Sequence, residues 1–169
     1  GAGLALVISL SIGALNGLLV SRTGIDSFLI TLAAFLMLQG LNLAVTKLVT
    51  GQVATPTIAD MEGFPSARTF FAGSFHIGDV RISVTVLWWL LFVAIASFVL
   101  FRTKFGNWIT AVGGDEDAAR AVGVPVGRVK VALFMTVGFA AWFVGMHTLF
   151  AFDSIQAGQG VGNEFLYII

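Results

Sequence analysis

The charged residues of this chain are confined to short stretches, and this pattern constrains the fold more than any other feature. Four windows contain no Asp, Glu, Lys or Arg: residues 1–21, 27–46, 82–101 and 131–152. Each has about 20 residues, the length of a helix that crosses the hydrocarbon core of a bilayer. Hydrophobic residues make up 57% of the chain and charged residues 11%. We therefore predict an all-α, polytopic transmembrane bundle with four spans in a single domain, residues 1–169.

The basic residues between these windows predict the orientation of the bundle. Arg22 and the Lys and Arg residues of the stretch 102–130 lie on one side of the predicted membrane. They outnumber the basic residues of the opposite loop, 47–81. Loops rich in Lys and Arg tend to stay in the cytoplasm, so we predict that 102–130 is a cytoplasmic loop.

The composition gives no support to several classes of function. The net charge is zero, so no nucleic-acid partner is expected. The chain has no cysteine, and therefore no disulfide or thiolate metal site. No metal-binding, phosphate-binding or nucleophile motif occurs in the sequence. We expect no catalytic, cofactor-binding or metal-binding residues and no enzyme activity, which leaves transport, channel or scaffold roles.

A short helix with clear start and stop signals is predicted inside the loop 102–130. Asp115 can act as its N-cap, and Glu116 and Asp117 place negative charge in its first turn. Gly123 can adopt a left-handed conformation after the helix, and Pro125 follows two residues later. A helix of about eight residues is marginal alone in water. We therefore expect another protein to hold it in place.

Small residues form a face on two of the predicted spans. In the first window they recur every four positions, at Ser9, Gly13, Gly17 and Ser21. In the fourth window they are Gly138, Ala141 and Gly145. Such faces let helix backbones approach closely within a membrane, so we interpret them as helix-packing surfaces.

Polar side chains at membrane depth are the candidates for a substrate path. Asn16 lies in the first window, and Gln39 and Asn42 lie in the second. An unpaired amide in lipid is costly, so these side chains should face the interior of the bundle. They could line a path or bond neighbouring helices, and the sequence leaves both roles open. His147 is a candidate proton carrier, but a packing role is favoured because no window contains a carboxylate partner.

Residues 105–123 resemble the cytoplasmic loop of permease subunits from bacterial ABC sugar importers of the ribose/xylose/galactose group. The matching residues are F-G-N at 105–107, A-V-G-G-D at 111–115, A-A at 118–119 and G-V at 123–124. The sequence D-A-A-x-x-x-G, from Asp117, is similar to the E-A-A-x-x-x-G signature of ABC importer permeases. Residues 13–20, G-A-L-N-G-L-L-V, are similar to the family's G-x-x-N-G-x-L-V.

The resemblance implies a multi-pass permease subunit of an ATP-binding-cassette importer in the bacterial inner membrane, with a monosaccharide or similar polyol as substrate. It implies that the loop helix couples the permease to a separate cytoplasmic ATPase. The implied coupling residues are Asp115, Glu116, Asp117, Ala118, Ala119, Arg120, Gly123 and Val124. Other implied partners are a periplasmic or lipid-anchored substrate-binding protein, a second copy of the permease or a related permease, and membrane lipid.

Family permeases are longer, so residues 1–169 are expected to be an excerpt, with a further helix beginning at Glu164. A permease for branched-chain amino acids remains an alternative, because its cytoplasmic loop looks similar. A secondary transporter and a membrane scaffold are further alternatives. A secondary transporter would usually carry a charged residue at membrane depth, and none of the four windows contains one.

Overall fold

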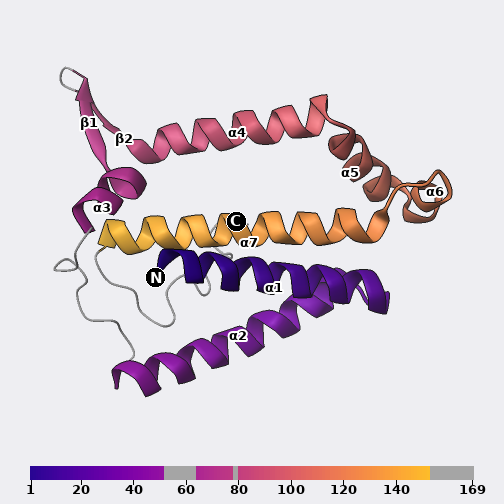
Figure 1. Ribbon diagram of the computed structural model, residues 1–169, viewed down its shortest axis with the longest axis horizontal. Coiled ribbons are helices and arrows are strands. Elements are labelled where there is room, and N and C mark those ends of the chain that lie inside the picture. Colours follow the sequence, from indigo (N-terminus) through magenta and orange to yellow (C-terminus); the bar gives the residue numbers. More distant parts are fainter. Residues whose placement is uncertain (52–63, 78–79, 153–169) are drawn as a thin grey trace, which may run out of the picture.

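The computed structural model describes residues 1–51, 64–77 and 80–152, and in these ranges long helices dominate (Figure 1). The long helices are α1 (Ala2–Thr23), α2 (Ser27–Thr50), α4 (Val84–Arg102) and α7 (Val126–Phe152). The shorter elements are α3 (Phe64–Ala72), β1 (Ser74–Ile77), β2 (Val80–Ser83), α5 (Lys104–Gly114) and α6 (Glu116–Ala121). The helix expected from Glu164 lies outside the described residues.

The four long helices are each long and apolar enough to cross a membrane. This confirms the predicted all-α bundle with four spans. The helices extend beyond the charge-free windows: α2 continues past Lys47, and α7 begins before Arg128 and Lys130. Basic side chains at the ends of a span can keep their charged heads in the interface while the helix continues. A charge-free window therefore measures the part of a helix in hydrocarbon rather than its full length.

α1 and α7 lie side by side along most of α1, in the most extensive contact between any two described elements (Figure 1). A Cβ atom at Gly13 would lie 2.5 Å from the carbonyl oxygen of Phe134, and one at Gly17 would lie 2.7 Å from the Cα of Val131. From the α7 side, a Cβ at Gly138 would lie 2.6 Å from a backbone oxygen of α1. The two backbones therefore touch, which confirms the packing role predicted for the small face of α1.

The small face of α7 packs only in part. Gly138 is buried against α1, and its carbonyl oxygen accepts a 2.6 Å hydrogen bond from the Ser9 hydroxyl. Ala141 is exposed, and a Cβ at Gly145 would have no neighbour within 4 Å. The predicted packing face is thus correct at Gly138 and does not extend to the other two positions in the described part of the chain.

Aromatic side chains hold α3 and α4 against α7. Phe71 of α3 stacks on Phe150 of α7, with ring centroids 5.5 Å apart, and also contacts Phe143. The ring centroids of Trp88 of α4 and Phe143 lie 5.2 Å apart. The Trp88 ring also donates a 2.9 Å hydrogen bond to the Phe70 carbonyl oxygen. Large rings that meet edge to face or stacked contribute about 0.5–1.5 kcal/mol per pair beyond their burial.

His147 takes part in the same contact. Its Nδ1 lies 2.8 Å from the carbonyl oxygen of Phe71. A carbonyl oxygen can only accept, so Nδ1 must carry the proton and donate it. This hydrogen bond joins α7 to the end of α3, and it supports the packing role rather than the proton-carrier role.

A two-stranded hairpin precedes α4, and the sequence analysis did not predict it. β1 and β2 pair antiparallel, with Ser74 opposite Ser83. The Val84 N–H then donates to the Gly73 carbonyl oxygen at 2.9 Å, which closes the base of the hairpin. A Gly-Asp pair between two short runs with β-branched residues is a known hairpin signal, and it is present in the sequence at 78–79.

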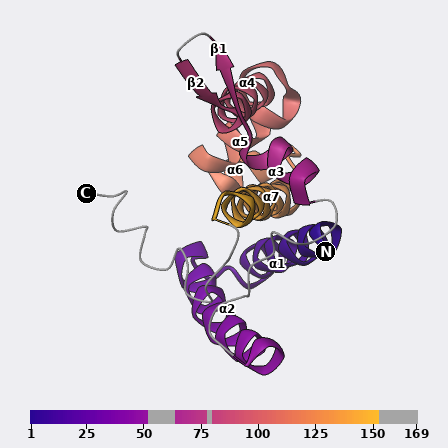
Figure 2. The same cartoon turned by 90° about the vertical axis from the view of Figure 1, so that its left-hand side faces the viewer.

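α2 follows α1 through a tight turn and then diverges from it (Figure 2). Gly24 adopts a left-handed conformation, φ 67°, and Asp26 caps α2 by accepting a 2.7 Å hydrogen bond from the Phe28 N–H. None of the described side chains of α2 is buried. Most of the surface that α2 presents to its surroundings is therefore apolar, and the exposed amides Gln39 and Asn42 are exceptions.

The α1–α7 contact predicts that two glycine-to-alanine substitutions differ strongly in their effect on the stability of the protein. Gly17→Ala should destabilise the protein by about 1–3 kcal/mol, because overpacking forces neighbouring backbone to move. Gly40→Ala in α2 is the matched control, since a Cβ there meets nothing within 4 Å. Thermal denaturation of each purified variant in detergent measures the difference. Equal melting temperatures for the two variants would show that α1 and α7 are not in tight contact.

Candidate functional site

The loop between α4 and α7 contains two helices, α5 and α6, where the sequence analysis predicted one. α6 corresponds to the predicted helix but has six residues rather than about eight. α5 was missed, although Thr103 is a suitable N-cap and apolar residues follow at Phe105, Ile109 and Val112 with helical spacing. The glycines of the G-G pair at 113–114 obscured this pattern, and they form the end of α5.

A glycine makes the sharp turn from α4 into α5 possible. Thr103 lies between the helices, where its hydroxyl donates to the Val99 carbonyl oxygen at 2.6 Å and accepts from the Gly106 N–H at 3.2 Å. Gly106 is buried, and a Cβ at this position would collide with the Leu100 carbonyl oxygen. The F-G pair of the sequence motif is therefore explained by close approach of α5 to the end of α4.

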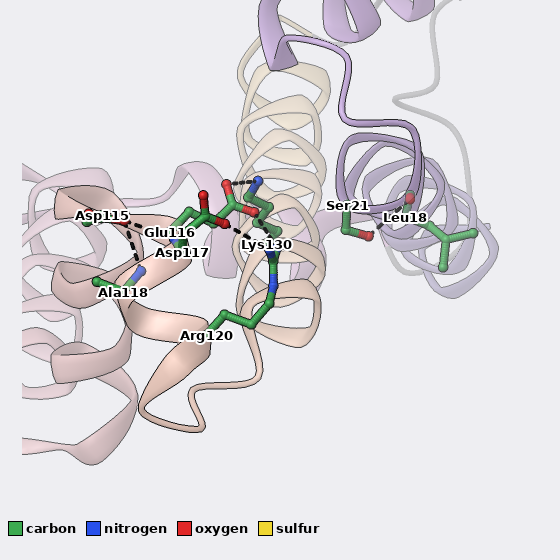
Figure 3. Close-up of polar contacts among 8 residues, drawn as sticks. All are labelled: Leu18, Ser21, Asp115, Glu116, Asp117, Ala118, Arg120 and Lys130. Carbon is green, nitrogen blue, oxygen red and sulfur yellow. Dashed lines mark hydrogen bonds and ion pairs between the residues drawn. The ribbon is translucent and has the colours of Figure 1, made fainter.

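Caps at both ends define α6. Oδ1 of Asp115 accepts hydrogen bonds from the N–H groups of Asp117 and Ala118, both at 2.9 Å (Figure 3). Gly123 has φ 85°, and the Val124 N–H donates to a carbonyl oxygen of the last turn of α6 at 3.0 Å. The predicted N-cap at Asp115 and the left-handed Gly123 are both confirmed. An N-cap such as Asp115 contributes about 1 kcal/mol to a helix.

Ion pairs attach α6 to α7 and brace α6 itself (Figure 3). Nζ of Lys130 donates to Oε2 of Glu116 at 2.6 Å, which joins the first residue of α6 to the second turn of α7. Arg120 pairs with Glu116 and Asp117 at 3.1 Å each, and both of these pairs lie within α6. The chain thus holds α6 partly by itself. The shortness of α6 therefore does not by itself require another protein to hold the helix in place.

Ala119 is buried within the chain, with 3% of its surface exposed, because its side of α6 lies against α5 and α7. Ala119 is one of the coupling residues that the resemblance implies, and its side chain faces the chain itself. The coupling role of α6 stays a prediction. The predicted coupling residues that are exposed are Asp115, Asp117, Ala118, Arg120 and Gly123. Glu116 and Val124 are half-buried.

Val122 is an exposed apolar residue that the sequence analysis did not single out. Its side chain is 79% exposed at the end of α6, beside the left-handed Gly123. The sequence signal was its position, as an apolar residue directly before the C-terminal glycine. Together with the exposed Ala118 and Arg120, Val122 forms the outer surface of α6.

The three amides of the expected substrate path lie on two diverging helices. Asn16 is half-buried on α1, whereas Gln39 and Asn42 are exposed on α2. Asn42 accepts a hydrogen bond from Thr46 at 3.5 Å, within its own helix. Their role as a path remains a prediction. In the described ranges, no three His, Asp or Glu side chains lie close enough together to hold a metal ion.

Known proteins similar to this chain include several import permeases. The ribose import permease protein RbsC of Escherichia coli (strain K12) is 29% identical over 161 residues, which cover 95% of this chain and 47% of RbsC. The fructose import permease protein FrcC of Rhizobium meliloti is 29% identical over 169 residues, 95% of this chain and 45% of FrcC. The chain spans about half the length of these curated relatives. No solved structure matches it.

The galactose/methyl galactoside import permease protein MglC of Haemophilus influenzae is also similar, with 29% identity over 135 residues. A family of permeases, described as "Branched-chain amino acid transport system / permease component", matches residues 1–169. The match covers the four membrane-length helices and the loop that carries α6, and it agrees with the resemblance noted in the sequence. The chain therefore belongs to this family of membrane permease components.

Proposed function

We propose that this chain forms part of the permease subunit of an ATP-driven importer in the bacterial inner membrane. One observation carries the proposal: a chain of this permease family presents a short, doubly capped helix, α6, between two of its membrane-length helices. Such a helix suits docking on a cytoplasmic ATPase, with 102–130 on the cytoplasmic side as the basic residues predict. The chain itself is non-catalytic in this proposal, and the ATPase hydrolyses ATP.

The substrate we propose is a monosaccharide or similar polyol. Support comes from the relatives, whose names specify ribose, fructose and galactose and which match most of this chain. The family description names branched-chain amino acids instead, so an amino acid is the alternative. A substrate-binding protein would deliver the sugar, and a second permease, identical or related, would complete the path within membrane lipid.

A transport assay tests the substrate class. The protein, its ATPase and its substrate-binding protein are reconstituted into liposomes, and uptake of radiolabelled D-ribose, D-galactose, D-fructose and L-leucine is compared. We expect saturable, ATP-dependent uptake of at least one sugar and none of L-leucine. Uptake of L-leucine alone would establish the amino-acid alternative, and uptake of none of them would reject the proposed function.

The exposed part of α6 is the proposed docking surface for the ATPase. Val122→Glu would place an unpaired charge in that contact, which costs several kcal/mol on burial. We expect normal membrane insertion and stability but at least tenfold less co-purified ATPase. Val122→Ala, which removes only two methyl groups, is the control and should keep most of the ATPase. Wild-type levels of ATPase with Val122→Glu would exclude this surface.

Ala119→Glu cannot serve as this test, since Ala119 is buried. A carboxylate there would disturb the packing of the loop itself.

The amides Gln39 and Asn42 are proposed to line the sugar path, because a side-chain amide can both donate to and accept from a hydroxyl. Gln39→Leu and Asn42→Leu should raise the KM for sugar uptake severalfold. Thr31→Val is the control, because the Thr31 hydroxyl already donates to the Ser27 carbonyl oxygen of its own helix at 2.9 Å. An unchanged KM in both Leu variants would remove these amides from the path.

A further inference from the structure

The ion pair between Glu116 and Lys130 joins the proposed docking helix to a membrane span. The two charged groups are 2.6 Å apart, and the Lys130 side chain is only 22% exposed (Figure 3). Partial burial weakens solvent screening and makes such a contact stronger than a pair on the open surface. Among the ion pairs that the structure describes in this loop, Glu116–Lys130 is the one that connects α6 to α7.

α7 is in turn fastened to α1 from one end of α1 to the other. Trp142 donates to the Ala2 carbonyl oxygen at 3.0 Å, and the Ser9 hydroxyl bonds the Gly138 carbonyl oxygen. The contacts at Gly13 and Gly17 follow along α1. At the C-terminal end of α1, a Cβ at Gly127 of α7 would lie 3.7 Å from the Cβ of Ser21. Backbones in direct contact leave no side chain to rearrange between them, so the pair resists sliding.

The other two long helices lack a comparable attachment in the described part of the chain. α4 contacts the α3–α7 layer through aromatic rings such as Trp88, Phe92 and Phe143, which can shift over one another. α2 meets α1 beside their connecting turn and diverges from it beyond that point (Figure 2). The contacts described between α4 and α7 themselves are between aromatic side chains, and such contacts permit the small shear motions by which packed helices move.

We propose that α6, α7 and α1 move as one rigid unit during the transport cycle, and that Lys130 is the positioning residue that keeps α6 on this unit. The inference rests on the proposed function, since it assumes that an ATPase acts on α6. Force applied to α6 would pass through Glu116 and Lys130 into α7. α1 would follow α7 because of their backbone contact, and it would carry Asn16 with it.

A reversible lock between α1 and α7 tests the rigid unit. None of the 169 residues is a cysteine, so the double variant Ser21→Cys/Gly127→Cys adds the only thiol pair within them. The Cβ separation of 3.7 Å suits a disulfide. In the reconstituted complex, the oxidised double variant should transport and hydrolyse ATP at rates within about twofold of its reduced form. Loss of transport on oxidation, restored by dithiothreitol and absent from the single variants, would overturn the rigid unit.

A distance measurement gives a readout that needs no sugar. Leu4 on α1 and Val144 on α7 are exposed and lie outside the glycine contact, so each can carry a spin label after Leu4→Cys/Val144→Cys. Electron spin resonance should give the same label-to-label distance in the ATPase complex with and without ATP and vanadate. A change of more than about 3 Å exceeds the usual shift between packed helices and would show that α1 and α7 move independently.

The role of Lys130 is tested by the number of sugar molecules transported per ATP hydrolysed. The sugar used is whichever of D-ribose, D-galactose and D-fructose the wild-type complex transports fastest. Lys130→Met should lower this ratio severalfold, because α6 would no longer be held to α7 by the ion pair, while the ATPase still co-purifies. Lys130→Arg should restore the ratio. Arg128→Met removes the same charge from the same helix without touching α6, and it is the matched control.

Two further measurements distinguish a failure of the positioning role of Lys130 from a failure of the proposed function. If Lys130 acts through Glu116, then Glu116→Gln/Lys130→Met should be no worse than Lys130→Met alone. Equal ratios for Lys130→Met and Arg128→Met, in a complex that transports normally, would reject the positioning role and leave the proposed function intact. A wild-type protein that binds no ATPase would reject the proposed function itself.

Discussion

The backbone contact between α1 and α7 is the interaction on which the rest of the described structure depends. Lipid supplies no hydrophobic drive between helices, so close packing of small residues and interhelical hydrogen bonds must replace it. The close packing comes from three glycines, Gly13, Gly17 and Gly138. The interhelical hydrogen bond comes from the Ser9 hydroxyl. α7 then serves as the base for its other neighbours, because α3 attaches to it through Phe71 and α6 attaches through an ion pair.

The loop between α4 and α7 solves a different physical problem, since it must be stable in water while it joins two apolar helices. Hydrogen-bonding caps define α6, and a buried glycine at 106 allows α5 to fold against the end of α4. The inner side of α6, with Ala119, is occupied by the chain itself. The outer side presents Val122 and a few charged groups. A docking partner would therefore meet a surface that is already ordered, which lowers the entropy cost of association.

The exposed apolar surfaces of α2 and α4 agree with a protein that works in a membrane. No described side chain of either helix is buried. In water such surfaces would drive aggregation, whereas in a bilayer lipid or neighbouring helices cover them. The charged groups are instead concentrated in the loop between α4 and α7 and at the start of α7. This separation of apolar and charged residues is what a membrane protein requires.

Local patterns in the sequence were enough to predict the four spans, the capped helix α6 and the polar loop that carries it. These features depend on local properties, namely the length of charge-free segments and the hydrogen bonds that residues such as Asp115 and Gly123 make with nearby backbone. The packing of Gly138 but not of Gly145, and the burial of Ala119 beside an exposed Val122, follow from the way the helices pack in three dimensions. Those outcomes depend on residues far apart in the chain, such as Ser9 and Gly138, whose meeting no local pattern specifies.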